Sequence, residues 1–228
     1  EAEHLGGRVV GGSHAALFVY AMTQTKHYNT FSEELKRIFG CKVHRISVDA
    51  GFNCPNRDGK LDTEGCIYCG GHGSGSYGIR RDLDIAAQLE DGKGVMRRKY
   101  RAQKFIAYFQ AYSNTYAPVE QLRKCFDKAR TVPDIVGIII ATRPDCVSGA
   151  VLDYLEGLSR QTFLWLELGV QSIYDRSLHV INRRHDHSCS VDAIQRARSR
   201  GLRVCAHIIL GLPGETKEEM LAMASELN

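Results

Sequence analysis

Residues 43–70 read VHRISVDAGFNCPNRDGKLDTEGCIYCG and form the most informative stretch of the chain. The first eight residues are largely β-branched and apolar, which predicts a strand at Val43–Ala50. The next twenty are rich in glycine and in other turn-forming residues, which predicts a loop. Three cysteines of this loop, Cys54, Cys66 and Cys69, are spaced C-x11-C-x2-C. The turn-forming residues allow the backbone to fold back and direct three sulfur atoms at one point.

Short apolar runs alternate with longer helical patterns along the rest of the chain. Four more strands are predicted at Lys104–Phe109, Ile135–Ala141, Phe163–Leu168 and Val204–Leu210. Helices are predicted near 82–100, 119–130, 149–160, 188–200 and 216–228. Several strands are apolar almost throughout, which is typical of parallel strands buried on both faces. Repeated strand–loop–helix units predict an α/β fold with right-handed crossovers, either a partial barrel or an open doubly wound sheet. Both place functional residues in the loops after the strands.

The two ends of the chain depart from this pattern. Residues 1–21 contain a mildly apolar stretch, but two acidic residues near the start argue against a signal peptide. Met22 resembles a natural start, so we expect 1–21 to be a disordered upstream extension and 22–228 to be the core. At the other end, Thr216–Glu219 form a capping box that opens a helix. The chain ends inside that helix, so we expect the native protein to continue.

The composition places the chain among ordinary globular proteins. Of its 228 residues, 43% are hydrophobic and 25% are charged, with a formal net charge of +4. The sequence has no apolar run of the roughly 18 residues that a membrane-spanning helix needs. Beyond the loop, the other cysteines are scattered: Cys41, Cys125, Cys146, Cys189 and Cys205. This distribution argues against a secreted disulfide scaffold and favours a reducing, cytoplasmic environment.

The cysteine loop is a candidate metal site, because thiolates are soft ligands suited to iron–sulfur clusters and to zinc. A structural zinc ion takes four protein ligands. Three cysteines on a [4Fe–4S] cluster leave one iron open to a substrate or cofactor. His72 would complete a Cys3His zinc site instead. From the loop alone, a cluster, a zinc ion and a loop without metal all remain open.

The loop resembles that of the radical SAM superfamily, in which a cysteine loop follows the first barrel strand and ends C-x-aromatic-C. The gap of eleven residues departs from the usual C-x3-C-x2-C. It is similar to the YhcC-type radical SAM proteins of bacteria and, more distantly, to the catalytic subunit of Elongator. The resemblance covers residues 26–228 and implies a partial (βα)6-type radical SAM TIM barrel, truncated at its C-terminus. It also implies a [4Fe–4S] cluster on Cys54, Cys66 and Cys69, with S-adenosylmethionine (SAM) as cofactor.

Motifs at four later strand ends occur in the order that the superfamily has. Residues 108–115 read YFQAYSNT, at the strand end that holds the methionyl amino group in the family, although they also suit a polar strand cap. Residues 142–145 read TRPD, as in the Elongator-like group. Arg143 there is expected either to face the cofactor or substrate or to form a surface turn with Asp145.

The fourth and fifth strands carry the motifs with the most specific resemblance. Residues 166–172 read LELGVQS and are followed by Asn182 and Arg183, similar to the coproporphyrinogen dehydrogenase and Elongator branches. There the arginine pairs with the SAM carboxylate, which suits a guanidinium fork. An ion pair of Arg183 or Arg184 with Asp186 is the alternative. After the fifth strand, residues 211–215 read GLPGE, a segment that borders the adenine in the family.

Carried over residue by residue, the resemblance nominates a set of cofactor-binding side chains. Glu167 would accept from ribose hydroxyls, His207 would lie near the ribose, and Tyr68 would pack near the adenine. For Tyr68 the alternative is a shield for the loop backbone, and for His207 it is a core histidine. The full set is Tyr68, Gln110, Tyr112, Glu167, Gln171, Arg183, His207 and Gly211.

The implied function is that of a radical SAM enzyme of the iron–sulfur oxidoreductase or transferase type. A cluster reduced by a flavodoxin- or ferredoxin-like donor would cleave SAM to a 5′-deoxyadenosyl radical, which abstracts hydrogen from a substrate. Kinship to Elongator makes tRNA a candidate substrate. A basic stretch near the loop would contact phosphates or form a solvated helix face: Arg80, Arg81, Lys93, Arg97, Arg98, Lys99, Arg101 and Lys104. The alternative function is a zinc-stabilised nucleic-acid-binding module without catalysis.

Overall fold

The computed structural model describes residues 28–71, 73 and 79–227. The expected upstream extension 1–21 and the candidate zinc ligand His72 lie outside the described residues. Helices and strands follow one another in the order α2 (Phe31–Phe39), β1 (Val43–Val48), α3 (Ile85–Tyr100), β2 (Lys104–Phe109), α4 (Val119–Arg130), β3 (Ile135–Thr142), η1 (Pro144–Cys146), α5 (Gly149–Ser159), β4 (Phe163–Gln171), α6 (Asp175–Val180), α7 (His187–Ser199), β5 (Arg203–Ile208) and α8 (Lys217–Glu226).

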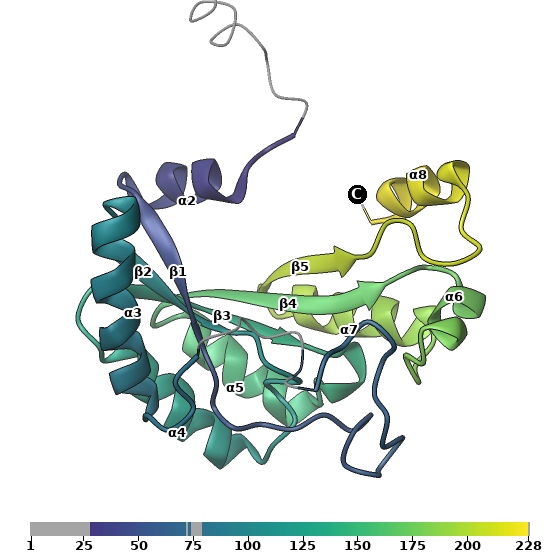
Figure 1. The fold of residues 1–228 in the computed structure, drawn as a ribbon, viewed down its shortest axis with the longest axis horizontal. Coiled ribbons are helices and arrows are strands. Elements are labelled where there is room, and N and C mark those ends of the chain that lie inside the picture. The colour runs from purple at the N-terminus through teal and green to yellow at the C-terminus, as the bar shows by residue number, and fades with distance from the viewer. Residues whose placement is uncertain (1–27, 72, 74–78, 228) are drawn as a thin grey trace, which may run out of the picture.

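The strands form one parallel five-stranded sheet in the order β1-β2-β3-β4-β5 (Figure 1). Each strand pairs with the next one along the chain, so the order never reverses. A doubly wound sheet reverses its strand order at a switch point, whereas a barrel wall does not. The structure therefore confirms the α/β fold and agrees with the partial barrel rather than the doubly wound alternative.

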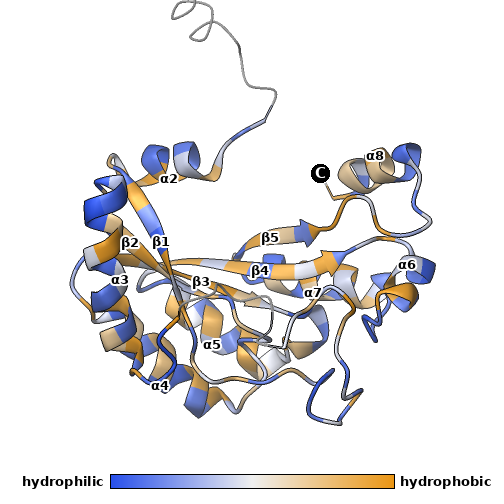
Figure 2. Ribbon diagram, in the orientation of Figure 1, coloured by the Kyte–Doolittle hydropathy of each residue, from blue (hydrophilic) through white to orange (hydrophobic). Residues whose placement is uncertain are grey.

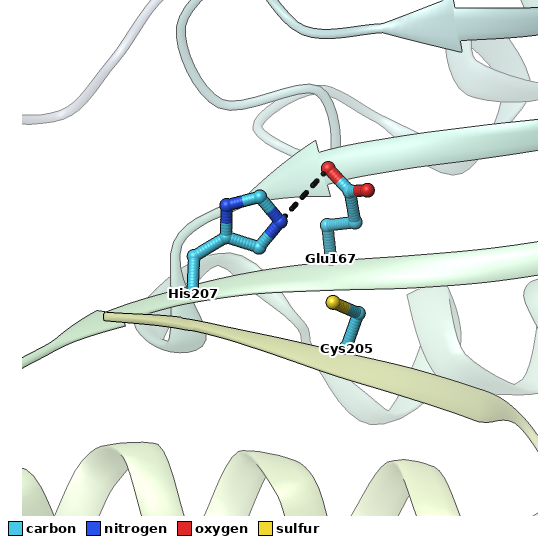
Figure 3. Close-up of side chains that lie close together, drawn as sticks. All are labelled: Glu167, Cys205 and His207. Atoms are coloured by element: carbon cyan, nitrogen blue, oxygen red, sulfur yellow. Dashed lines mark ion pairs between the residues drawn. The ribbon is translucent and has the colours of Figure 1, made fainter. Parts of the chain in front are cut away.

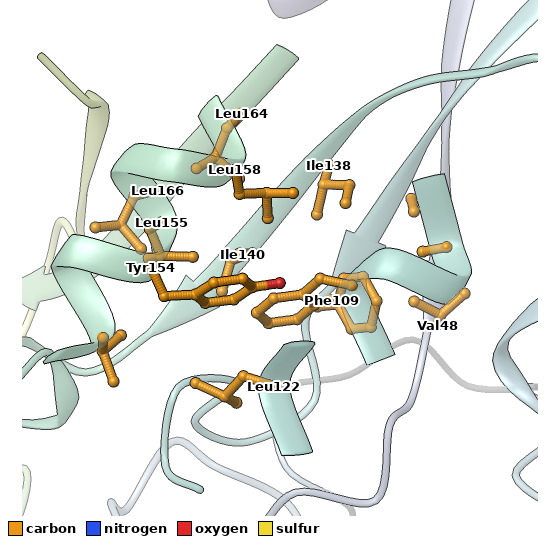
Figure 4. Close-up of a cluster of buried hydrophobic side chains, with 14 of the residues drawn as sticks. Val48, Phe109, Leu122, Ile138, Ile140, Tyr154, Leu155, Leu158, Leu164 and Leu166 are labelled. Atoms are coloured by element: carbon orange, nitrogen blue, oxygen red, sulfur yellow. The ribbon is translucent and has the colours of Figure 1, made fainter. Parts of the chain in front are cut away.

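The main hydrophobic core lies between the sheet and the helices α3, α4, α5 and α7. Alternate residues of each strand point to this side, among them Phe109, Ile140 and Leu166, and they pack against Leu122 and Leu155 from the helices (Figure 4). The strands are mostly apolar, while the helices alternate apolar and polar stretches (Figure 2). Burying each large aliphatic or aromatic side chain stabilises the fold by about 1.5–3 kcal/mol.

The opposite face of the sheet is the inner wall of the partial barrel. Helix α2 covers one end of it, where Leu35 packs with Val43, Ile106 and Ile139. This helix was not predicted, although Thr30 starts it with a capping box of the kind that sequence patterns reveal. Other inward positions carry polar side chains, so this face is not filled by a second complete apolar core.

The predicted capping box at the start of α8 is confirmed, with Thr216 accepting from the backbone of Glu219. Strand β4 continues to Gln171, three residues past its predicted end, through an irregularity in its pairing with β5 between Gly169 and Gln171. Within the described residues, no helix has the length and apolar character that crossing a membrane requires.

Candidate functional site

The cysteine loop follows β1, and its three sulfur-bearing residues line one cavity of about 260 Å³. Cys54, Cys66 and Cys69 are free thiols, and Cys66 is 6% exposed. Two turns shape the loop, with the Arg57 amide donating to the Cys54 carbonyl and the Cys69 amide to the Cys66 carbonyl. Burial raises the pKa of the Cys69 thiol. The Arg57 guanidinium acts to lower this pKa, whereas the nearby Cys66 and Cys54 raise it further. The proximity of three free thiols fits the donor set of an iron–sulfur cluster.

The gap between the first two cysteines docks on the segment after α6. The Arg184 guanidinium donates to Asp62 Oδ2 at 2.9 and 2.5 Å, and Asn182 Nδ2 donates to Asp62 Oδ2 at 3.1 Å and to the Gly65 carbonyl at 2.8 Å. Arg184 therefore pairs with Asp62, while Asp186 caps α7. The ion pair of Arg184 with Asp186 that the sequence left open is not formed. The long gap holds the loop against a distant part of the chain.

Most of the nominated cofactor-binding residues line the same cavity as the cysteines. The cavity-lining members are Tyr68, Gln110, Tyr112, Glu167, Gln171, Arg183 and His207. Gly211 is not among the lining residues; it is exposed in a left-handed turn, where its amide donates to Met220 Sδ at 3.2 Å. The order of strand ends along the sheet explains why residues so far apart in sequence converge here.

Arg183 connects the cysteine loop with β4. Its guanidinium donates from Nη2 to the Gly169 carbonyl at 2.5 Å and from Nη1 to Cys66 Sγ at 3.7 Å, while Nε has no partner among the described residues. A side chain at Gly169 would displace it, because a Cβ there would lie 2.8 Å from Arg183 Nη2 and 2.5 Å from Gln171 Nε2. The absence of a side chain at Gly169 is what leaves room for the guanidinium.

Arg143 provides a second buried cation at the cavity. It is 2% exposed, pairs with both carboxylate oxygens of Asp145 at 2.8 Å and donates to the Arg183 carbonyl at 2.9 Å. Arg143 thus lines the cavity and is buried, so its pairing with Asp145 is not the surface turn that the sequence left open, and the expectation that it faces a cofactor or substrate stays a prediction. Arg143 Nη1 and Arg183 Nε have no hydrogen-bond partner in the described part of the chain, and both residues line the cavity, so the site fits a bound carboxylate.

Unusual backbone conformations gather around this site. Tyr112, Gln171, Asn182 and Arg184 all have positive φ, between 55° and 70°. Non-glycine residues rarely adopt this conformation, and such strain concentrates at functional sites where the surrounding structure holds it in place. Tyr112 illustrates this, because its hydroxyl donates to the Gly71 carbonyl at 2.9 Å.

Inside the partial barrel, Glu167 lies at the centre of a polar network that borders the cavity. The Tyr108 hydroxyl donates to Glu167 Oε2 at 2.8 Å, and His207 Nε2 lies 3.2 Å from the same oxygen (Figure 3). Arg45 Nη1 lies 3.9 Å from Oε1. Burial opposes ionisation of Glu167, yet hydrogen bonds from His207 and Tyr108 keep its pKa below the usual value.

The same network brings together three groups able to bind a metal ion. The ligand atoms of Glu167, Cys205 and His207 all lie within 4.8 Å of one another (Figure 3). Cys205 and Glu167 raise the pKa of His207 to about 10, so the imidazole is a cation at neutral pH. Since both oxygens of Glu167 already face cations or donors, the arrangement is an ion-pair network in this state.

Several members of the predicted basic stretch are paired with carboxylates. Arg80 pairs with Asp82, Arg81 with Asp49, Lys93 with Glu90 and Arg97 with Asp134. Lys93 is only 2% exposed and also donates to the Pro133 carbonyl. These pairs reduce the positive charge that this face would present to a phosphate backbone.

Sequence reasoning missed two side chains that hold the cysteine loop in place. Asn56 is fully buried and donates to the Asn182 carbonyl at 2.6 Å, 126 positions along the chain. Arg57 donates to the Cys69 carbonyl at 2.6 Å and to the Gly70 carbonyl at 3.0 Å. No periodicity or motif identifies these residues, because their role depends on contacts formed after folding.

Comparisons with known proteins identify the family of the chain. The family model of the Radical SAM superfamily matches residues 54–227. Uncharacterized protein YtqA of Bacillus subtilis (strain 168) is 45% identical over 207 residues, covering 91% of this chain and 64% of YtqA. Protein YhcC of Escherichia coli (strain K12) is 43% identical over 201 residues, covering 88% of this chain and 64% of YhcC. The chain thus spans less than two thirds of the length of both relatives.

Among solved structures, the archaeal Elp3 of Methanocaldococcus infernus superposes with a TM-score of 0.58. The match covers 81% of this chain and 42% of Elp3, at 20% identity, and shows a shared fold. The family match extends from Cys54 through β5 and into α8, and therefore includes every residue that lines the cavity. On this evidence, the chain belongs to the radical SAM superfamily.

Proposed function

We propose that this chain binds a [4Fe–4S] cluster through Cys54, Cys66 and Cys69 and holds SAM in the adjoining cavity. The observation that carries the proposal is that one cavity is lined by all three thiols and by seven of the eight nominated cofactor-binding residues. When bound and reduced by a flavodoxin- or ferredoxin-like donor, the cluster would cleave SAM to a 5′-deoxyadenosyl radical that abstracts hydrogen from a substrate.

The protein's own contribution is binding, orientation and exclusion of water. Arg183 and Arg143 are buried cations, each with one N–H-bearing nitrogen that no described residue contacts, and they suit the carboxylate of SAM. Tyr68 at the cavity rim, with 38% of its surface exposed, suits an aromatic face against the adenine. Glu167 helps to orient His207, because its Oε2 accepts from the Tyr108 hydroxyl and lies 3.2 Å from His207 Nε2. His207, with 45% of its side chain exposed, would make the contact with the cofactor.

The decisive test is anaerobic reconstitution with iron and sulfide, followed by electron paramagnetic resonance of the reduced protein with and without SAM. We expect a [4Fe–4S] signal that changes on adding SAM and is absent from a Cys54/Cys66/Cys69→Ala variant. A Cys41→Ala/Cys125→Ala variant is the matched control, because these half-buried thiols lie outside the cavity and should leave the signal intact. Binding of one equivalent of zinc in place of a cluster would refute the proposal and favour the zinc-stabilised module.

For the substrate, we propose tRNA as the first candidate, on the resemblance to Elongator. The measurement is release of 5′-deoxyadenosine with and without intact tRNA, and with the same tRNA digested to nucleosides as the control. Stimulation by intact tRNA alone is expected. Equal rates in all three samples would reject tRNA while leaving the proposed SAM chemistry untouched.

A further inference from the structure

The buried residue Asn56 belongs to the cysteine loop and contacts the segment that follows α6. Its side chain is 0% exposed, and its Nδ2 group carries two hydrogens with two acceptors in reach. One acceptor is the Asn182 carbonyl at 2.6 Å and the other is Cys66 Sγ at 3.5 Å. Oδ1 is buried without a partner among the described residues. An asparagine that leaves its own oxygen unsatisfied is held there for its two N–H groups.

The orientation of this amide follows from its surroundings. Turning the amide over would place Oδ1 against the Asn182 carbonyl at a distance of a hydrogen bond, where two acceptors repel. The same rotation would set Oδ1 against Cys66 Sγ, which is a thiolate whenever it ligates iron. The N–H group must therefore face the sulfur, and the carbonyl of Asn182 fixes it in place.

Arg183, in the segment after α6, provides a second donor to the same sulfur. Arg183 Nη1 lies 3.7 Å from Cys66 Sγ, and its guanidinium is held by the Gly169 carbonyl. Asn56, Cys66 and Arg183 are all 6% exposed or less, so water does not compete for these contacts. In a dry environment of low dielectric constant, hydrogen bonds to a charged acceptor are at their strongest.

We propose that Asn56, together with Arg183, sets the reduction potential of the cluster by donating to the sulfur of Cys66. The inference rests on the proposed function, because it requires a cluster on these cysteines. Hydrogen bonds to ligand sulfurs withdraw negative charge and stabilise the reduced cluster, which raises its potential. Reduction adds one electron from the external donor, and no bond forms or breaks in this step. Asn56 is a positioning residue, because it acts through Cys66 and does not touch SAM.

This role also gives a physical reason for the eleven-residue gap. Asn56 lies two positions after Cys54, and the following residues carry the chain out to Asp62, which docks on Asn182 and Arg184, and back to Cys66. A three-residue gap would have to turn directly from one cysteine to the next. The expanded loop therefore places a buried donor against the sulfur of Cys66.

The test compares potentials of reconstituted proteins, measured by titration with dithionite and read by electron paramagnetic resonance. Asn56→Leu keeps the branched shape of the side chain without a donor, and Asn56→Ala removes the amide altogether. Both are expected to bind the iron and sulfide of one cluster and to have a more negative midpoint potential than wild type. Asn182→Gly is the matched control, because it keeps the carbonyl that fixes Asn56, suits the positive φ and removes only the side-chain contacts with Asp62 and Gly65. Its potential should not change.

The outcomes separate this inference from the proposed function. A wild-type protein that takes up no cluster would remove the proposed function. A loaded wild type with unchanged potentials in Asn56→Leu and Asn56→Ala would overturn the inference alone. If neither variant takes up a cluster, the inference is tested on wild type instead. Electron–nuclear double resonance is then recorded on the reduced wild-type protein with ¹⁵N-labelled asparagine. A nitrogen coupling to the cluster is expected, and its absence would overturn the inference.

Discussion

Replacing Gly92 with alanine measures how closely α3 packs against β1, the strand that leads into the cysteine loop. A Cβ at this position would lie 2.3 Å from Ile46 Cγ2, and Ile46 is 3% exposed in the main core. Helix propensity alone favours alanine by about 1 kcal/mol. Overpacking a core costs about 1–3 kcal/mol, and a contact this much shorter than the usual ~3.5 Å belongs at the upper end. We expect a net loss of about 2 kcal/mol in the free energy of unfolding.

The assay is urea unfolding followed by far-ultraviolet circular dichroism. Gly94→Ala in the same helix is the control, because its Cβ would meet only the flexible end of Arg98, at 3.4 Å. That variant should be more stable than wild type by up to about 1 kcal/mol. In an Ile46→Ala background, Gly92→Ala should lose its penalty, since the clashing methyl is gone. A Gly92→Ala protein as stable as wild type would refute the packing argument.

Three further predictions concern the cavity and the last helix. Gly169→Ala should weaken SAM binding by roughly 10- to 150-fold in anaerobic calorimetry, since displacing Arg183 forfeits a charged hydrogen bond of about 1.5–3 kcal/mol; unchanged affinity would contradict it. Cys205 and Glu167 raise the pKa of His207 to about 10 from 6.5, so the folded protein keeps a proton that the unfolded chain releases. Stability should therefore fall as the pH rises from about 6.5 to about 10, and His207→Gln should flatten that slope; equal slopes would argue against it. Thr216→Ala should lower stability by about 1 kcal/mol through loss of the α8 cap, while Thr216→Ser should not.

Local sequence patterns were enough to predict the five strands and the longer helices between them. All five predicted strands overlap observed ones, and the boundaries of β2 and α4 were predicted correctly. Buried parallel strands are recognisable because both faces are apolar, and the intervening helices repeat at regular intervals. The short α6 was missed because six residues give too little periodicity to detect. Residues 51–70 also predicted three thiols in one loop, because the spacing of the cysteines can be read directly from the sequence.

Only the tertiary structure decided which of these residues meet at one cavity. Which residues face the cavity follows from strand register, and a shift by one residue would turn Glu167 and His207 to the helix side. The exclusion of Gly211 from the cavity, the pairing of Arg184 with Asp62 and the burial of Asn56 behind Cys66 all involve contacts over long sequence separations. Such contacts leave no local signature, since they arise when the ends of distant strands meet at one edge of the sheet.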